Sequence, residues 1–332
     1  MELTDAQETR VKTAPILRGR TLGSHPDTFL NFKKWNSTSP IYSSDSSVGG
    51  GYFLILNHKG IVVDPGYDFL WSFLKIFSIE DIDTIIITHD HPDHCDDVPR
   101  IINLLHETNI LKEQNHQRRI SIDFFVSTGV HVRYGSMLSS RDTLEHVVSP
   151  GLIFYLPDHR LFFTATLTRH PEIIGTDTGF GIRLRMRTPG GLDIGITGDT
   201  GYHTGLIRAF DGTRMLVAHI GRVRDQVTRG FSNKHLTFPG IVTLVSRLSA
   251  VPDLVVVSEF GEETSGSRCE ISERLEQHIQ RHGRAVRCIP AERNMCIKLN
   301  PLEVGRADLG IYKTPSLIRT VEDPLRGEIY YQ

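Results

Sequence analysis

The chain has 332 residues, of which 39% are hydrophobic and 23% are charged, and its formal net charge is −2. These values are those of an ordinary globular protein, and they exclude a general electrostatic attraction to nucleic acid or to an anionic membrane. No apolar run reaches the roughly 18 residues of a membrane-spanning helix. Residues 1–20 lack the apolar core of a signal peptide, and four cysteines are too few for a disulfide framework. We therefore expect a reduced, cytoplasmic protein.

The chain divides into three parts by composition. Residues 1–48 are polar and are interrupted by glycine and proline, so they are predicted to form an N-terminal extension. This extension is expected to pack on the core or to border the mouth of an active site. Residues 49–300 hold the regular apolar patterns and are predicted to form one domain, and residues 301–332 are predicted to be a polar C-terminal tail.

The first elements of the domain follow three glycines at 49–51. Apolar runs at 52–56 and 61–63, joined by a turn, predict a β-hairpin. Apolar residues at helical spacing predict amphipathic helices over 67–79 and from residue 98 onward. Further apolar runs predict a mixed α/β chain, with strands at 120–126, 151–156, 161–169, 180–187, 192–197, 215–220, 254–259, 286–290 and 295–299, helices at 239–248 and 270–282, and partly helical structure over 130–150.

One stretch carries the densest chemistry. The apolar run 84–87 is predicted to be a buried strand, and it leads directly into Thr88-His89-Asp90-His91-Pro92-Asp93-His94. Imidazole and carboxylate are ligand types that suit zinc and its first-row neighbours. Because a tight turn points successive side chains in different directions, this segment can supply two adjacent metals.

Further candidate ligands stand at predicted strand ends. Two ions need about seven protein ligands if each is to keep a place for water. His170 closes the strand 161–169, Asp199 follows the strand 192–197, and His235 precedes a predicted helix. His159 is the rival candidate for the place of His170, and His203 is a second rival candidate ligand. Cys95 adjoins the ligand turn, and a buried free thiol is favoured for it over a metal contact.

The turn spells H-x-H-x-D-H and resembles the signature of the metallo-β-lactamase fold superfamily, with a likeness that extends from about residue 43 to residue 299. The resemblance implies an αββα sandwich of two mixed β-sheets flanked by helices, with a metal site at one edge. It implies that Asp64 supports the metal loop. It also implies two ions, zinc or alternatively manganese, with a water or hydroxide between them, and it assigns these ligands: His89, His91 and His170 on one ion, Asp93, His94 and His235 on the other, and Asp199 as the bridge. Many members continue the signature with glycines, where this chain has Cys95-Asp96-Asp97.

Three later motifs resemble the ribonuclease Z-like phosphodiesterase branch: Gly198-Asp199-Thr200, Ala218-His219 and Lys234-His235-Leu236-Thr237. The likeness implies a hydrolase that uses the metal-bridging hydroxide, with Asp93 and His219 as catalytic residues. His219 is expected to give a proton to the leaving oxygen, although a core histidine at a strand end is the simpler interpretation. A lactonase or other ester hydrolase of the same fold and a non-catalytic metal-binding scaffold are the alternatives.

The spacing of the ligands bears on the substrate. Transfer-RNA-processing relatives carry a long arm between the third histidine and the bridging aspartate, but only 29 positions separate His170 from Asp199, and predicted strands fill them. We therefore expect a small or short phosphodiester, such as a cyclic nucleotide, rather than a large nucleic acid or a membrane. Four arginines are candidates to hold its phosphate: Arg183, Arg185, Arg222 and Arg224. A homodimer is also possible.

Overall fold

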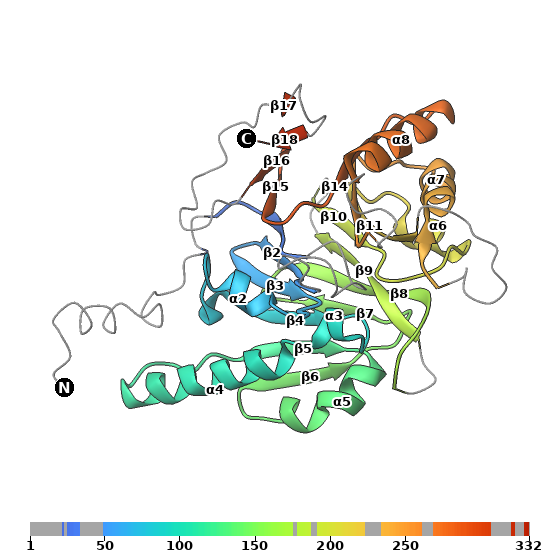
Figure 1. Ribbon diagram of the computed structural model, residues 1–332. Coiled ribbons are helices and arrows are strands. Elements are labelled where there is room, and N and C mark those ends of the chain that lie inside the picture. The colour runs from blue at the N-terminus through green and yellow to red at the C-terminus, as the bar shows by residue number, and fades with distance from the viewer. Residues whose placement is uncertain are drawn as a thin grey trace, which may run out of the picture.

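The computed structural model describes residues 22, 25–33, 49–174, 178–186, 191–222, 234–260, 268–306, 320–322 and 329–331. Most of the strands in these ranges lie in two mixed sheets of eight strands each. Figure 1 shows the helices on the outer sides of these sheets. Within the same ranges, no helix is both long and apolar enough to cross a lipid bilayer.

The first sheet carries the metal-ligand turn. Its strands, in spatial order, are β16 (Leu302–Arg306), β15 (Met295–Leu299), β1 (Thr28–Asn31), β2 (Tyr52–Leu56), β3 (Lys59–Val63), β4 (Thr84–Ile87), β5 (Ile122–Val126) and β6 (Thr143–Val147). Strands β2 and β3 pair antiparallel and form the predicted hairpin. Strands β3 to β6 run parallel, so their carboxyl ends meet at one edge of the sheet.

The second sheet faces the first. Its order is β14 (Arg287–Pro290), β13 (Leu254–Ser258), β11 (Met215–Arg222), β10 (Asp193–Ile196), β9 (Thr178–Met186), β8 (Leu161–Pro171) and β7 (Ile153–Leu156), with β12 (Leu236–Thr237) beside β11. Strands β10, β11, β13 and β14 are parallel. Their carboxyl ends therefore also gather at one edge, which is where ligands bind in open α/β sheets.

Three apolar cores hold the layers together. One lies between the sheets and takes side chains from both, such as Ile86 and Val217. A second lies under α2 (Phe69–Phe73), α4 (Val98–Gln114) and α5 (Thr128–Leu138), and a third under α6 (Gly205–Phe210), α7 (Phe238–Arg247) and α8 (Arg268–Arg281). Strand β4 shows how the layers form, because Ile86 enters the first core whereas Ile85 and Ile87 enter the second. The predicted αββα sandwich is thus confirmed.

Some predicted elements differ from those observed. The helix expected over 67–79 is only the short α2, and it is followed by turn residues in which Ile76 and Phe77 both donate to the carbonyl of Phe73. The stretch 130–150 contains the rest of α5, which begins at Thr128, and also strand β6, whose side chains are mostly half-buried or exposed. An edge strand of this kind lacks the strong apolar alternation that would reveal it in the sequence.

The N-terminal part of the chain contributes more than an extension. Strand β1 pairs with β2 on one side and with β15 on the other, so it lies inside the first sheet. In the tail, β16 pairs with β15, and β17 (Thr320–Glu322) pairs with β18 (Ile329–Tyr331). The division into extension, core and tail stays a prediction, but residues from all three parts take part in strand pairing.

Candidate metal centre

The signature turn meets the second sheet at the common edge of the two sheets. His89 and His91 follow β4, His170 lies near the end of β8, and Asp199 follows β10. One ligand atom from each of these four side chains lies within 4.8 Å of the others. We call these four residues the first group. Loops from two facing sheets therefore deliver three imidazoles and one carboxylate to one point.

The turn after β4 is held by buried carboxylates on both sides. Asp64 accepts hydrogen bonds from the backbone N–H of Thr88 (2.7 Å) and from its hydroxyl (2.9 Å), and it lies 2.9 Å from Nδ1 of His94. Its predicted supporting role is confirmed. Asp90 accepts hydrogen bonds from the backbone N–H groups of residues 173 and 174, which ties the segment after His170 to the same turn.

A close backbone approach also shapes the turn. A Cβ atom on Gly66 would lie 1.9 Å from the carbonyl oxygen of Asp93, so only glycine fits at this position without moving the ligand turn. The N–H of Asp97, just past the turn, donates to the carbonyl of Pro65 beside this glycine. The hairpin end and the ligand turn are thus fixed to each other before any ion binds.

The rings of the first group are oriented through their outer nitrogens. His89 Nδ1 lies 3.0 Å from the hydroxyl of Thr88, and His170 Nδ1 lies 3.0 Å from the carbonyl oxygen of Lys234. The other nitrogen of His170 lies 3.2 Å from Nδ1 of His91. Buried His89 Nε2 makes no hydrogen bond within the described part of the chain. Such an arrangement, with one nitrogen anchored and the other turned inward, is typical of metal-ligating histidines.

The charge states of these groups suit a divalent cation. Burial lowers the pKa of His170 to about 4, and burial together with the neighbouring His94 lowers that of His89 well below its ordinary value. Burial acts to raise the pKa of Asp199, but the hydrogen bond with His219 and the surrounding imidazoles bring it well below the usual range. Neutral imidazoles and an ionised carboxylate are the forms that bind metals, so the first group fits such an ion.

A second group lies beside the first. Nε2 of His94 is 3.5 Å from Asp93 Oδ2 and 3.5 Å from Glu259 Oε1, and these three side chains offer ligand atoms within 4.8 Å of one another. Glu259 follows the end of β13 and is nearly buried. The sequence interpretation did not single it out, although it stands at the same strand-end edge as Asp199. The ammonium of Lys33 also contacts this group, at His94 and Glu259.

His235 is not part of the second group. Its Nδ1 lies 3.6 Å from Asp199 Oδ2, and its ring centroid lies 4.6 Å from that of His170, which places it on the side of the first group. Its side chain is 37% exposed. In the structure Asp93 and His94 lie beside Glu259, and the assignment of His235 to the second ion stays a prediction.

His219 is buried against the bridging position. Its Nδ1 lies 3.0 Å from Asp199 Oδ1, and its Nε2 lies 2.9 Å from the hydroxyl of Tyr52, which in turn lies 2.8 Å from Ser258 Oγ. The side chain of His219 is 1% exposed. Both ring nitrogens are thus engaged by protein groups, and this arrangement favours a residue that holds Asp199 over one that faces a substrate.

Other candidates lie apart from the centre. The thiol of Cys95 is buried and donates to the carbonyl of His91, and burial raises its pKa to about 12. Arg183 pairs with Asp193 at 2.7 Å. Arg185 also lies opposite Asp193, the first residue of β10, whereas Asp199 follows the far end of that strand. The side chain of Arg222 and all of Arg224 lie outside the described residues, so two of the four proposed phosphate-holding arginines are placed away from the ligands.

Comparisons with known proteins agree with this architecture. A family model described as a beta-lactamase superfamily domain matches residues 59–257. An uncharacterized protein of Methanocaldococcus jannaschii is 28% identical over 254 residues, which cover 75% of this chain and 87% of that protein. Among solved structures, the metallo-beta-lactamase fold protein YhfI from Bacillus subtilis matches with a TM-score of 0.65 and 15% identity, covering 82% of this chain and 99% of its own.

Two further structures resemble this chain at lower scores. Yeast PDE1 matches with a TM-score of 0.58 and 10% identity, covering 81% of this chain and 98% of its own. The short form of human tRNase Z matches with a TM-score of 0.53 and 15% identity, covering 82% of this chain and 98% of its own. At these identities the likeness establishes the shared fold.

Proposed function

The chain belongs to the beta-lactamase superfamily of metal-dependent hydrolases, and on that premise we propose that it is a phosphodiesterase acting on a small or short phosphodiester, such as a cyclic nucleotide. The observation that carries the proposal is the convergence of His89, His91, His170 and Asp199 at the sheet edge, with a buried Nε2 of His89 that forms no hydrogen bond among the described residues. Histidines with one carboxylate are ligand types that catalytic zinc sites use, and the set includes none of the cysteines that dominate structural zinc sites.

Bound ions would supply a nucleophile near neutral pH, by lowering the pKa of water, and would stabilise charge on the phosphoryl group. We propose zinc in the first group and, at higher metal concentration, a second ion held by Asp93 and His94 with Glu259; manganese is the rival metal. Asp199 lies within 3.9 Å of His89 and His170 and 3.8 Å from His94, so it can serve both ions. The chain's own contribution is to hold these groups in place.

We assign His219 the task of holding Asp199. A general acid must reach the leaving oxygen with a free ring nitrogen, whereas both nitrogens of His219 are used by Asp199 and Tyr52. Asp93 reaches the second group and keeps its proposed catalytic place there, because its Oδ2 lies 3.5 Å from His94.

The substrate class rests on the space around the site. Between His170 and Asp199 the chain forms the end of β8, then β9 and β10, which are successive antiparallel neighbours in the sheet, and residues 175–177 and 187–190 are all that lies outside the described elements and their immediate flanks. This leaves no length for an arm that would bind a large RNA. The resemblance to yeast PDE1 supports the same substrate class.

Four free thiols are consistent with the proposed cytoplasmic location.

A substrate panel tests the proposal. Metal-free protein, resupplied with zinc or manganese, is offered cyclic mononucleotides, short dinucleotides, bis-nitrophenyl phosphate, lactones and a tRNA precursor. We expect metal-dependent hydrolysis of small diesters and weak or absent action on the precursor. Hydrolysis of lactones alone would favour the lactonase alternative. Site-specific cleavage of the precursor without action on small diesters would overturn the size argument. Metal binding without any turnover would favour the non-catalytic metal-binding scaffold.

A further inference from the structure

The second group already contains a cation that belongs to the chain. The side chain of Lys33 is buried, and its ammonium lies 3.3 Å from Nδ1 and 3.3 Å from Nε2 of His94. It also forms an ion pair with Glu259, whose side chain is only 9% exposed. The ammonium thus uses two of the three side chains that would bind a second metal ion.

The backbone around Lys33 is built to keep it there. The side chain of Asn31 accepts a hydrogen bond from the N–H of Lys33 at 3.1 Å, and its amide donates to the carbonyls of Lys33 and Glu292. On the other side Gly50 lies so close that an added Cβ would be 2.1 Å from the carbonyl oxygen of Phe32 and 2.8 Å from Cα of Lys33. Strand β1 is therefore clamped at the point where Lys33 enters the site.

The first group differs in this respect. Asp199 is its one carboxylate, and within the described ranges its ion-pair partners are all histidines. Among the described residues, no lysine or arginine forms an ion pair with this carboxylate. In the second group, each contact that Glu259 gives to the ammonium is withheld from an ion, and two cations at such short range repel each other strongly when buried.

We propose that Lys33 is a built-in competitor for the second metal position. Glu259 and His94 hold either the ammonium or an ion, so the two positions have unequal affinities: the first fills readily, and the second fills only when Lys33 gives up its contacts. The inference rests on the metal binding of the proposed function but not on its substrate.

Zinc titration of metal-free protein against a competing chelator of known affinity tests this directly, with bound metal as the readout and no substrate present. We expect the wild type to bind one ion tightly and a second more weakly. Lys33→Met should leave the first affinity unchanged and tighten the second by about tenfold or more, which is the gain expected if the ammonium fills the position at least about nine-tenths of the time.

Two further variants keep the test sharp. Lys59→Met is the matched control, since Lys59 is also an ion-paired lysine, with Asp83, but lies in another part of the first sheet. It should titrate like the wild type. Glu259→Gln should lose the second ion and keep the first, which tests the same assignment even if Lys33→Met fails to fold. An unchanged second affinity in a folded Lys33→Met variant, or a wild-type second affinity in Glu259→Gln, would overturn the proposal.

Discussion

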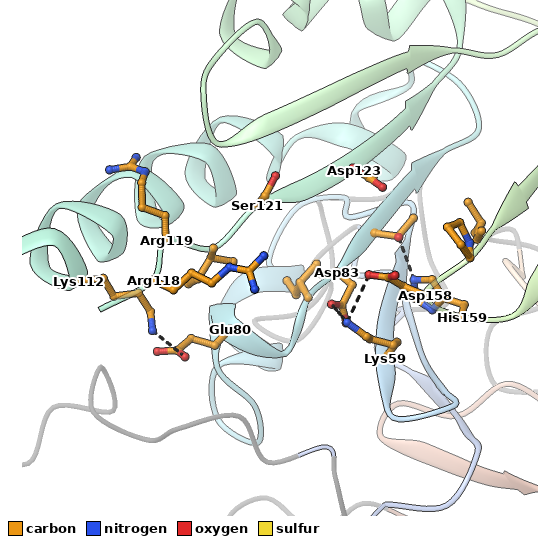
Figure 2. Close-up of a pocket in the computed structure, with 15 residues that line it drawn as sticks. Lys59, Glu80, Asp83, Lys112, Arg118, Arg119, Ser121, Asp123, Asp158 and His159 are labelled. Carbon is orange, nitrogen blue, oxygen red and sulfur yellow. Dashed lines mark hydrogen bonds and ion pairs between the residues drawn. The ribbon is translucent and has the colours of Figure 1, made fainter. Parts of the chain in front are cut away.

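The two ends of β4 hold very different polar sites. At its start, a cavity of about 550 Å³ is lined by charged side chains that include Lys59, Glu80 and Lys112. Figure 2 shows these charges in pairs: Lys59 lies 3.1 Å from Asp83 and Lys112 lies 3.0 Å from Glu80. At the other end of the same strand, the first group brings imidazoles together around one carboxylate.

This difference between the cavity and the first group indicates which of the two sites is suited to bind a ligand. Paired charges at the cavity satisfy one another and gain little from a ligand. Burying several imidazole nitrogens together costs free energy unless hydrogen bonds satisfy them, and His89 Nε2 forms no hydrogen bond among the described residues. The size of a cavity is therefore a poorer guide here than the convergence of groups of one chemical kind.

The largest expected effect comes from Asp199, the carboxylate proposed to serve both ions. Asp199→Asn should release metal from the first group and reduce hydrolysis by roughly 10³-fold or more, because an ion's stabilisation of the transition state is worth several kcal/mol. Metal content by elemental analysis and kcat/KM on the best diester measure the two effects together.

Asp83→Asn in the cavity is the matched control. It removes one carboxylate that bonds Lys59 and the backbone of Gly60, and it should leave metal content and kcat/KM near wild-type values. If the two variants lost metal to the same extent, the contrast between the two ends of β4 would be refuted.

A smaller effect is expected from the residues behind the bridge. His219→Ala should lower metal affinity or activity by about 10–100-fold, as removal of a partner that orients a ligand does. The loss should be equal for substrates with good and poor leaving groups, since His219 acts through Asp199. A loss confined to poor leaving groups would instead restore the general-acid role.

Tyr52→Phe tests the contribution of the next residue, whose hydroxyl contacts His219. The change removes the hydroxyl that bonds His219 and Ser258, so we expect a destabilisation of about 1–3 kcal/mol by denaturant unfolding, because a buried polar partner is left unsatisfied. Its effect on metal affinity should be smaller than that of His219→Ala. A larger effect would mean that Tyr52 itself reaches the substrate or the ions.

At the cavity end, the expected effects are small. Lys112→Ala breaks a partly exposed ion pair with Glu80, and such pairs contribute about 0–1 kcal/mol. Thermal or denaturant unfolding should detect little, and hydrolysis should be unchanged. A marked loss of activity on the preferred diester would show that the cavity contributes to function and would weaken the comparison.

The least effect should come from Cys95. Its thiol is buried, and its pKa is raised to about 12 by that burial, so almost no reactive thiolate exists near neutral pH. Iodoacetamide should label the partly exposed Cys269 well before Cys95. Rapid labelling of Cys95 that zinc suppresses would place the thiol at the metal after all.

Much of the site could be predicted because its residues follow a simple rule. His89, His91, Asp93 and His94 come directly after an apolar strand, and Asp199 follows another, so strand ends located most of the ligands. Glu259 obeys the same rule and was overlooked because a single glutamate after a strand is common. The fold class followed from the resemblance of the same turn to the metallo-β-lactamase signature, and the continuous apolar strands agree with it because such strands must be covered on both faces.

The remainder depends on contacts between distant parts of the chain. Lys33 follows only a brief apolar run, Phe29, Leu30 and Phe32, in a mainly polar segment, which is too short to show that β1 enters the centre of a sheet. It meets Glu259 only through that pairing. The place of His235 likewise depends on the pairing of β12, which begins just after it, with β11. The two bonds of His219 were hidden too, because Tyr52 is far away in sequence and adjacent only after the sheets face each other.

Anomalous diffraction at the zinc absorption edge, from crystals of the zinc-loaded protein, tests the central claim most directly. The account predicts a strong anomalous peak within bonding distance of His89, His91, His170 and Asp199. It also predicts a weaker peak at His94 and Glu259, which becomes stronger in the Lys33→Met variant. The absence of a peak among the first four residues, or a principal peak in the cavity at the start of β4, would contradict it.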